Sequence, residues 1–483
     1  MAIALLWLPL AGALVAALTP WRTWVAWTAS ASVAATLVLG VLEATRVVRT
    51  GAIVSLGGIL RIDALSAFMV LVIASVGVLA TSQSARYLTH EIERGQCSRA
   101  RASLYVVLVQ LFIAAMMLGV LAANVGVMWV AVEATTIVTT FLVGFRRTRG
   151  ALEASWKYII ICSVGIAIAF LGTVLVYLAD SHAGHGPASL QWTSLVASAH
   201  LLNPGVVRLG FALVVLGYGT KVGWAPMHAW LPDAHGQSPA PVSALMSGVL
   251  LSVAFYVVLR FKAIADIALG ANFSRGLLLG VGLLTLAVAS SMLVRQRDYK
   301  RMLAYSSMEH VGLLALGAAA GSPLAIAAVL LHVLGHGLAK GVLFLASGEM
   351  LHDEGTSDID GVRALLTRRP ALGGLFAFGL VALLGLPPFS LFISELTMFR
   401  AEVTAGLGWV VAVTLVLMAI IFLAIFSYAR TMLLGARTDD EPAHATSVAV
   451  TAPLATALVA CAALGVVAWP LSSLLHAAAQ VVV

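Results

Sequence analysis

The strongest constraint in this sequence is the recurrence of apolar stretches, each about 20 residues long, from one end of the chain to the other. A helix of about that length crosses the roughly 30 Å hydrocarbon core of a bilayer. Of the 483 residues, 61% are hydrophobic and only 10% are charged. A soluble chain of this composition would expose too much apolar surface to stay dispersed. The sequence therefore predicts an all-α polytopic membrane protein.

The apolar stretches predict about 14 transmembrane helices, at one stretch per crossing. No basic residues precede the first stretch, so we expect a membrane span there rather than a cleaved signal peptide. The expected spans are 2–19, 23–45, 62–82, 103–120, 122–145, 155–179, 206–227, 240–260, 273–294, 302–320, 322–349, 371–399, 407–429 and 448–475.

The basic residues predict how the chain is oriented. Every Lys and Arg except Lys221 and Lys340 lies in a connection between spans or at the edge of a span, where it is counted with the adjoining connection, and the odd-numbered connections hold the larger share. Cytoplasmic connections carry the excess of basic residues, so we expect both termini on the outer side of the cell membrane. The formal net charge of +7 follows from this topology, and the sequence has no long basic run of the kind that binds nucleic acid.

The sequence offers no evident site for a redox centre, a metal or a nucleotide. Its three cysteines, Cys97, Cys162 and Cys461, stand far apart, and neither a CxxC pair nor a Walker-type phosphate loop occurs. We therefore expect no cofactor, no metal and no catalytic residues in this chain. Electron transfer, if it is coupled to this protein, would take place on other subunits.

Four charged residues are expected deep inside apolar helices: Glu133, Lys221, Lys340 and Glu395. Each costs roughly 2.5–3.5 kcal/mol at a helix centre, so these groups must be paired or must face water inside the bundle. The simplest interpretation is a structural salt bridge, or a side chain that reaches the membrane interface. Four such groups, of both signs, favour the other interpretation, a series of titratable sites that pass protons.

Two histidines precede one of these lysines at helical spacing. His332, His336 and Lys340 are four residues apart, so they lie on one face of a helix in successive turns. Alone, the histidines would be core residues bonded to neighbouring helices; with the lysine in register, we favour a proton relay. A metal site is not favoured, because no carboxylate lies near them in the sequence as a third ligand.

Two expected spans are interrupted, the seventh at Gly223 and Pro226 and the twelfth at Pro387 and Pro388. Proline breaks a helix, and a break at membrane depth is tolerated only inside protein or beside a cavity. The breaks are five helices apart, which is typical of inverted repeats around a transport site. We therefore expect helices 7 and 12 to be discontinuous.

This symmetry predicts four segments along the chain. The first holds helices 1–3, the next two are inverted repeats made of helices 4–8 and helices 9–13, and the last holds helix 14. Their expected limits are residues 1–102, 103–262, 263–434 and 435–483.

Five further residues are weaker candidates. His228, Asp233 and His235 follow the first break and could control access at the membrane face. Ser252 in the eighth span and Glu309 in the tenth could extend a water path. Histidines in loops are common, so His228 and His235 also have a purely structural interpretation.

Several segments form a distinctive set of motifs. They are WVAVEATT around Glu133, KVGWAPMHAWLPDAHGQSPAPVSALMSGVLL around Lys221, DYKRMLAYSSMEHVG in the tenth span and HxxxHxxxK ending at Lys340. This set resembles the proton-pumping, antiporter-like membrane subunits of respiratory complex I and of multisubunit cation/proton antiporters. ALEASWKYIIICSVGIAIAFLGT and GLPPFSLFISE are similar to the hydrogenase-4 component F type, found in group 4 membrane-bound hydrogenases and formate hydrogenlyase complexes.

The resemblance implies a site, a function and partners. Glu133 and Lys221 would form the ion pair of a first half-channel. The second half-channel would use His332, His336, Lys340 and Glu395. The chain would be a subunit without redox cofactors in a complex I-like or group 4 hydrogenase complex, an oxidoreductase whose catalytic centre lies on other chains. It would translocate protons or Na⁺ and would contact the lipid bilayer, other membrane subunits and a peripheral redox arm.

The eighth span departs from the family pattern. Several relatives carry Lys or His in its middle, where this sequence offers only Ser243, Ser247 and Ser252. A serine can hold a water molecule but cannot carry the proton itself, so water would have to bridge the two half-channels.

Two alternatives stay open at this point. The chain could act alone as a Na⁺/H⁺ antiporter, which activity of the purified chain in proteoliposomes would reveal. It could also be the membrane partner of a soluble zinc protein in inorganic-carbon uptake, which the neighbouring genes would reveal.

Overall fold

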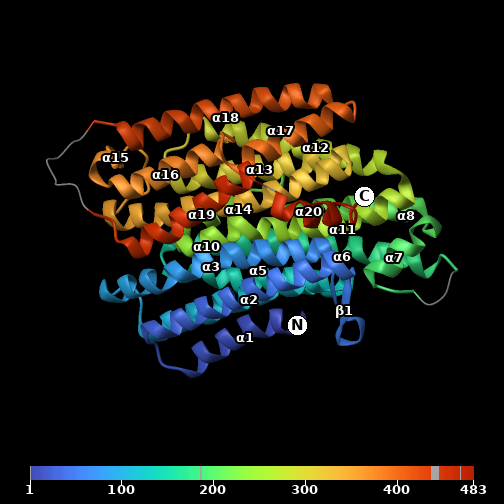
Figure 1. Ribbon diagram of the computed structural model, residues 1–483, viewed down its shortest axis with the longest axis horizontal. Coiled ribbons are helices and arrows are strands. Elements are labelled where there is room, and N and C mark those ends of the chain that lie inside the picture. Colours follow the sequence, from blue (N-terminus) through green and yellow to red (C-terminus); the bar gives the residue numbers. More distant parts are fainter. Residues whose placement is uncertain (1, 185–187, 437–444, 468) are drawn as a thin grey trace.

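The chain folds into a bundle of long helices that lie side by side, as the computed structural model of residues 2–184, 188–436, 445–467 and 469–483 shows (Figure 1). The helices up to the first break are α1 Ala2–Leu18, α2 Thr23–Thr50, α3 Ala64–Glu93, α4 Arg99–Leu121, α5 Val125–Val143, α6 Arg149–Ser181, α7 Trp192–Ser198 and α8 Pro204–Val222. Those beyond it are α9 Trp230–Gln237, α10 Ala240–Leu245, α11 Leu251–Leu269, α12 Ala271–Leu293, α13 Tyr299–Ala320, α14 Pro323–Glu354, α15 Leu365–Arg368, α16 Pro370–Leu383, α17 Ser390–Thr404, α18 Gly408–Leu434, α19 Val448–Val466 and α20 Trp469–Ala479.

The helical membrane fold is confirmed, and its details differ from the expectation. Among the described residues, 11 helices are long and apolar enough to span a membrane, and the shorter α1 and α16 are also apolar. The number of about 14 spans is therefore not reached by these criteria. A small antiparallel hairpin also interrupts the helical series, with β1 Ile53–Ser55 paired to β2 Leu60–Ile62. The sequence patterns did not predict this hairpin.

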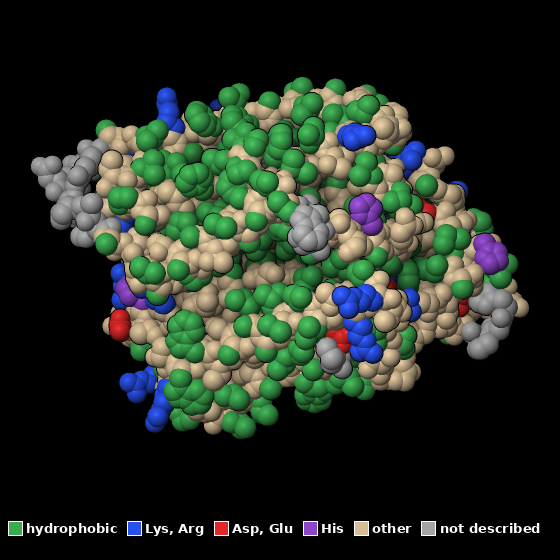
Figure 2. Space-filling view, in the orientation of Figure 1, with side chains coloured by type: hydrophobic (Ala, Val, Ile, Leu, Met, Phe, Trp, Pro, Cys, Tyr) green, Lys and Arg blue, Asp and Glu red, His purple; other side chains and the backbone are tan. Residues whose placement is uncertain are grey.

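The surface agrees with a membrane setting. Figure 2 shows hydrophobic side chains over most of the middle of the visible face, whereas most Lys and Arg side chains lie toward its left and right ends. The helices run along the same horizontal direction in Figure 1. On this face the apolar side chains therefore lie mainly between the two ends of the helices, as a bilayer requires.

The centre of the bundle is built on two spans whose most apolar windows are wholly buried. One is Ala240–Leu269, which comprises α10, a π-helical turn at Met246–Leu250 and α11, and the other is α14. A helix that is apolar all round belongs in a core and not at a surface. α14 packs against α3, α13, α16 and α17, so a polar side chain in its wholly buried stretch meets other helices and not lipid.

Both expected helix breaks are present. α8 ends at Val222, and Gly223 follows in a left-handed conformation with φ of 90°. A Cβ atom at this position would lie 2.4 Å from Leu231 Cδ1, so only glycine fits. Past α16, Gly385 is also left-handed, with φ of 61°, and α17 begins only at Ser390.

The expected single helix over 448–475 is wrong. α19 ends at Val466, α20 begins at Trp469, and α20 packs against α3. Pro470 has no backbone N–H to donate, so a helix can begin at this proline but cannot run through it undisturbed. The C-terminal segment therefore contributes two helices in place of one.

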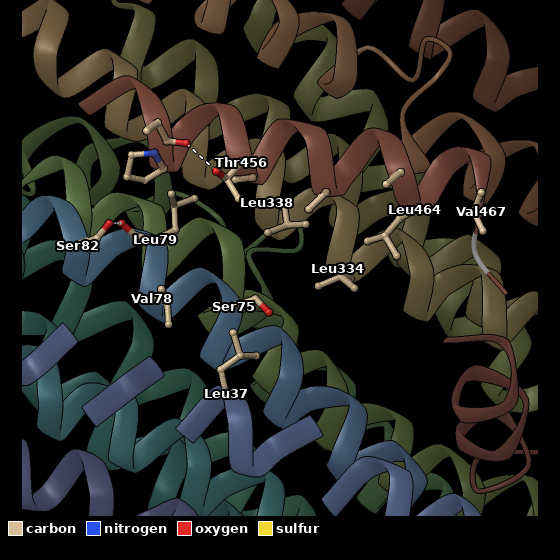
Figure 3. Close-up of a pocket in the computed structure, with 15 residues that line it drawn as sticks. Leu37, Ser75, Val78, Leu79, Ser82, Leu334, Leu338, Thr456, Leu464 and Val467 are labelled. Carbon is tan, nitrogen blue, oxygen red and sulfur yellow. Dashed lines mark hydrogen bonds between the residues drawn. The ribbon is translucent and has the colours of Figure 1, made fainter. Parts of the chain in front are cut away.

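An apolar groove of about 930 Å³ separates α19 from α3 and α14. Its lining is aliphatic apart from a few hydroxyl groups, and side chains such as Val78, Leu338 and Leu464 project into it (Figure 3). No charged residue belongs to its described lining. We refer to this space as the α19 groove.

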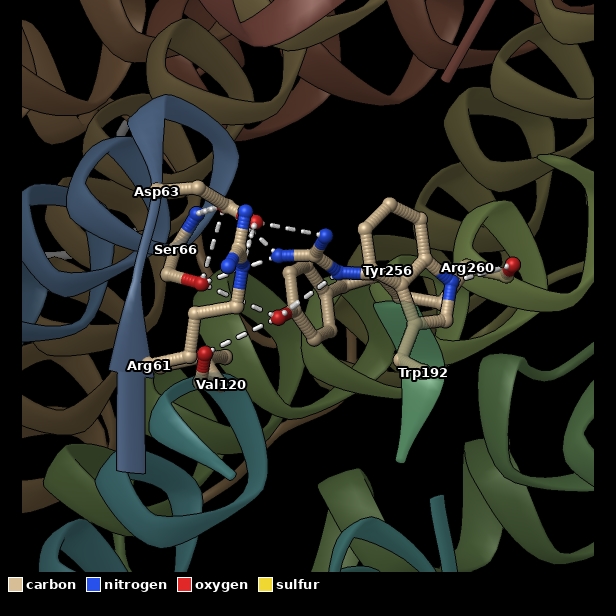
Figure 4. A network of polar contacts seen from close by, with 7 residues as sticks. All are labelled: Arg61, Asp63, Ser66, Val120, Trp192, Tyr256 and Arg260. Atoms are coloured by element: carbon tan, nitrogen blue, oxygen red, sulfur yellow. Dashed lines mark hydrogen bonds and ion pairs between the residues drawn. The ribbon is translucent and has the colours of Figure 1, made fainter. Parts of the chain in front are cut away.

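One fully buried ion pair joins α11 to the start of α3. Arg260 Nη1 and Nη2 donate to Asp63 Oδ2 and Oδ1 at 2.8 Å and 2.7 Å, and Arg260 also donates to Tyr256 and Ser66 (Figure 4). Burial by itself would raise the pKa of Asp63, but the Arg260 guanidinium lowers this pKa to about 2. The pair therefore stays charged at physiological pH. The sequence assignment, which placed Arg260 in a connection, is wrong: its side chain is only 2% exposed.

This pair should carry a large part of the local stability. Removing one partner of a buried ion pair costs about 3–5 kcal/mol, because the other charge stays buried without a partner. We therefore expect Arg260→Ala to lower the melting temperature of the detergent-solubilised protein clearly, as measured by fluorescence-detected size exclusion. The matched control is Asp360→Asn, which breaks the exposed pair with Arg363 and should change little. Equal melting temperatures for the two variants would contradict this account.

Candidate functional site

Lys221 is held by hydroxyl groups in the last turn of α8. Its side chain is fully buried, and Nζ donates to Thr136 Oγ1 at 2.9 Å and to the Tyr158 hydroxyl. Nζ also lies 4.6 Å from the centre of the Tyr158 ring, which adds a cation–π attraction. Tyr158 OH in turn bonds to Thr139. The ammonium thus has good hydrogen-bond partners, all of them uncharged.

Glu133 lies on the neighbouring α5 but does not pair directly with this lysine. Its Oε1 accepts a hydrogen bond from Ser163 at 3.2 Å, and its Oε2 has no partner among the described residues. No carboxylate of the described chain lies within 4 Å of Lys221 Nζ. The direct contact implied by the resemblance is therefore absent in this structure, although both side chains face the same α5–α6–α8 region.

The first break is anchored by two tryptophans. Trp230 Nε1 donates to Thr220 O at 2.8 Å, which satisfies a carbonyl at the end of α8. Trp224 Nε1 donates to Val311 O on α13 at 2.8 Å. The chain after Lys221 is thereby attached to both halves of the bundle.

Lys340 is also fully buried and has no carboxylate partner in the described part of the chain. From α14, its Nζ donates to Leu303 O at 2.7 Å and to Ser306 Oγ, both on α13. Glu309 is buried one turn further along α13, yet it lies beyond 4 Å from the ammonium. Lys340 therefore resembles Lys221 in its surroundings and differs from the ion-paired Arg260.

His332 and His336 lie in successive turns of α14, as predicted, and His310 of α13 adds a third imidazole beside them. His310 Nδ1 and His332 Nε2 lie 2.9 Å apart, and His332 Nδ1 lies 3.0 Å from Ser394 Oγ on α17. The His336 ring centre is 4.9 Å from that of His310, and neither of its nitrogens has a partner among the described residues. These groups link α13, α14 and α17 through their side chains.

Glu395 lies beside this cluster, at the second break. It is 6% exposed, and its Oε1 has no partner among the described residues. Its Oε2 would be 2.2 Å from a Cβ atom at position 385, so Gly385 makes room for the carboxylate. Glu395, on the C-terminal side of its break, thus sits against the interrupted backbone.

The sequence argument against a metal site was that no carboxylate lies near the histidines, and the fold brings one beside them. Ligand atoms of His310, His332 and Glu395 lie within 4.8 Å of one another. A carboxylate distant in sequence thus joins two histidines in space, and these groups could hold a transition-metal ion. The same atoms already form a hydrogen-bonded path, because His310 and His332 share a bond.

Of the three residues expected at the membrane face after the first break, only His235 is fully buried. Asp233 is partly exposed and pairs with two cations, Lys157 at 3.0 Å and Arg301 at 2.9 Å. His228 is only partly buried. His235 is not at the face at all: it is fully buried, stacks on Phe344 with ring centres 5.2 Å apart, and has no hydrogen-bond partner for either nitrogen among the described residues.

Serines line the centre of the bundle between the two lysines. Ser247, in the π-helical turn between α10 and α11, bonds to Ser307 on α13 at 2.7 Å. Ser252 is buried close by at the start of α11. At Gly248, a Cβ atom would approach Gly337 O to 3.0 Å, so the two central spans cross closely here.

Sequence reasoning missed several contacts that matter at this site. Tyr158, Thr136 and Ser394 all bond to the expected residues, and their residue types are too common in membrane helices to stand out. Ser306 and His310 did have a signal, since both lie close to Glu309 in the tenth expected span.

Comparisons with known proteins show the family and the fold of the chain. Residues 122–422 match the family described as NADH:quinone oxidoreductase/Mrp antiporter, transmembrane. The hydrogenase-4 component F homolog of Methylacidiphilum infernorum (isolate V4) is 40% identical over 340 residues, which cover 70% of this chain and 71% of that protein. NADH-quinone oxidoreductase subunit N of Desulforudis audaxviator (strain MP104C) is 30% identical over 365 residues, which cover 75% of this chain and 70% of that protein.

A solved structure shows the same fold over the whole chain. A subunit of the membrane-bound sulfane sulfur reductase, an archaeal respiratory membrane complex, superposes with a TM-score of 0.88 at 24% identity, covering 100% of this chain and 98% of its own. The family match spans more than half of the sequence, from the α5 region to α18. The chain is therefore an antiporter-like membrane subunit and belongs to the NADH:quinone oxidoreductase/Mrp antiporter transmembrane family.

Proposed function

We propose that this chain translocates protons through two half-channels, as a membrane subunit without redox cofactors in a complex I-like or group 4 hydrogenase complex. The first half-channel is centred on Glu133 and Lys221, and the second runs from Lys340 past the histidines to Glu395. Redox chemistry on partner subunits would supply the driving force.

The observation that carries this proposal is the contrast between the buried cations. Arg260 has a bidentate carboxylate partner, as a structural ion pair should. Lys221 and Lys340 are bound only by hydroxyl and carbonyl oxygens. A fixed ammonium inside a membrane without a counter-charge is costly, whereas an amine that gives up its proton relieves that cost. Both lysines are thus suited to take up and release protons.

The path through the second half-channel follows the hydrogen bonds. Ser306 contacts the ammonium of Lys340, and the His310–His332–Ser394 series reaches the helix that carries Glu395. A histidine can accept a proton on one nitrogen and release one from the other. Ser247 and Ser252 would hold the water that joins this path to the first half-channel.

Inverted repeats would explain why each half contains a break beside an ionisable group. In this proposal 1–102 forms the N-terminal helices, 103–262 and 263–434 form the repeats, and 435–483 forms the C-terminal segment. Backbone groups freed at a break are available to bind water or an ion. The breaks at Gly223 and Gly385 would therefore be the places where each half-channel opens and closes.

Removing the Glu133 carboxylate or the Lys221 amine from the first half-channel should stop most of the proton movement. We expect Glu133→Gln and Lys221→Ala to reduce proton movement by roughly a hundredfold, the scale expected for a positioned acid–base group. The measurement is substrate-driven acidification of vesicles that contain the complex purified with this chain. Lys157→Ala, which removes an exposed lysine, is the control and should pump normally. Pumping by both variants at the normal rate would contradict the proposal.

The imidazole of His332, which links α13, α14 and α17, should also be needed for proton movement. His332→Ala removes the link between His310 and Ser394, so we expect proton movement in the same vesicles to fall at least about tenfold. His476→Ala removes an exposed histidine that bonds only to its own helix and should have no effect. If His332→Ala behaves like His476→Ala, the path does not pass through this residue.

The orientation of the chain is a separate proposal. We place both termini on the outer side of the cell membrane, in line with the distribution of basic residues, and Figure 1 has both ends in the same half of the view. A membrane-impermeant maleimide should then label Thr50→Cys but not Arg295→Cys on intact cells. The native cysteines are all buried, so the background should be low. The reverse labelling pattern would invert the topology.

A further inference from the structure

Two adjoining cavities of opposite character lie at the arginine-rich end of the bundle. The first, which we call the basic pocket, has a volume of about 450 Å³, and its lining includes Glu91, Arg94, Arg101, Phe145, Arg146 and His352. The second, which we call the apolar groove, has a volume of about 390 Å³ and lies between α4, α5 and α6. Arg101 and Phe145 line both, so the two cavities meet at these side chains.

The basic pocket has an excess of positive charge and of free donors. Its three guanidinium groups face a single carboxylate, Glu91, which lies 3.3 Å from Arg146. Each guanidinium offers five N–H groups. Arg94 uses one on His352 O, and Arg101 uses two on backbone carbonyls. The donors left over suit a ligand with several anionic oxygens, such as a phosphate.

The apolar groove presents side chains that a soluble surface would not tolerate. Leu104 is 50% exposed, Phe141 62% and Trp156 66%, and all three line the groove. These residues lie in membrane-spanning helices, so the groove opens toward hydrocarbon. At its charged edge stand Arg101 and Arg147.

We propose that the basic pocket and the apolar groove together bind one anionic phospholipid, with its phosphate in the pocket and an acyl chain in the groove. Basic pockets between membrane helices are suited to phospholipid head groups, and here the hydrocarbon site begins at the same arginine. The α19 groove is larger but has no charged lining in the described chain, so it would accept hydrocarbon without selecting a head group. This proposal is independent of the proton path.

Trp156 gives a direct reporter of the acyl chain. The full chain, in phosphatidylcholine vesicles, is compared with either dibrominated phosphatidylglycerol or dibrominated phosphatidylcholine as the minor lipid. Bromine quenches nearby tryptophan, and subtracting the signal of Trp156→Phe isolates this one residue among the 11 tryptophans. We expect phosphatidylglycerol to compete for the site roughly fivefold better, the factor expected for about one basic side chain near an anionic lipid.

Paired charge variants then test the charged groups of the proposed site, with Arg94 from the basic pocket and Arg147 from the charged edge of the apolar groove. Arg94→Gln combined with Arg147→Gln should abolish the preference. Arg295→Gln combined with Arg297→Gln removes equal charge from exposed positions in the α12–α13 connection and should preserve it. Equal quenching by the two lipids in the unmodified chain would overturn the proposal. Equal loss of preference in both double variants would overturn it as well, because general surface charge would then explain the effect.

Discussion

The cost of an ammonium group inside hydrocarbon is the constraint on which the rest of this structure depends. Such a charge is tolerated only with a partner or with water, and this bundle treats its buried cations in two ways. Arg260 receives a carboxylate, a tyrosine and a serine. Lys221 and Lys340 receive neutral oxygens alone. The first arrangement holds two helices together, and in the proposed function the second leaves a proton free to move.

The position of α14 follows from the same constraint. A helix that carries two histidines and a lysine can cross a membrane only if other helices enclose it, and α14 is indeed surrounded by α3, α13, α16 and α17. The nearby breaks supply the polar backbone that a wholly helical bundle would lack. Glycine suits both, since Gly223 and Gly385 have left-handed φ angles of 90° and 61°, and a Cβ atom there would approach the side chains of Leu231 and Glu395 closely. The enclosing helices thus keep the polar side chains of α14 away from lipid, and the helix breaks place polar backbone groups beside them.

Much of this could be predicted from the sequence, because the relevant patterns are local. Apolar length indicated the helices, proline and glycine indicated both breaks, and the spacing of four indicated the shared face of His332, His336 and Lys340. Contacts between distant segments could not be predicted in this way. The carboxylate beside His332 comes from α17, and the partner of Arg260 comes from the start of α3, so each depends on which helices become neighbours.

Other predictions were wrong because the place of a residue in the sequence was taken to indicate its burial or its contact partner. His235 follows a break and resembles a loop residue, yet it is buried against Phe344. Glu133 and Lys221 were expected to form an ion pair, but the Lys221 ammonium donates its hydrogen bonds to hydroxyl groups on α5 and α6 instead. In each case the side chains that fill the space were too ordinary in type to be noticed in the sequence.

The central claim is that the two buried lysines lose and regain a proton, and replacement by arginine tests it most directly. Arginine keeps the charge and the donors but stays protonated. The account predicts that Lys221→Arg and Lys340→Arg assemble with their partners yet translocate no protons, whereas Lys157→Arg at the surface works normally. Normal proton translocation by the two buried arginine variants would contradict it.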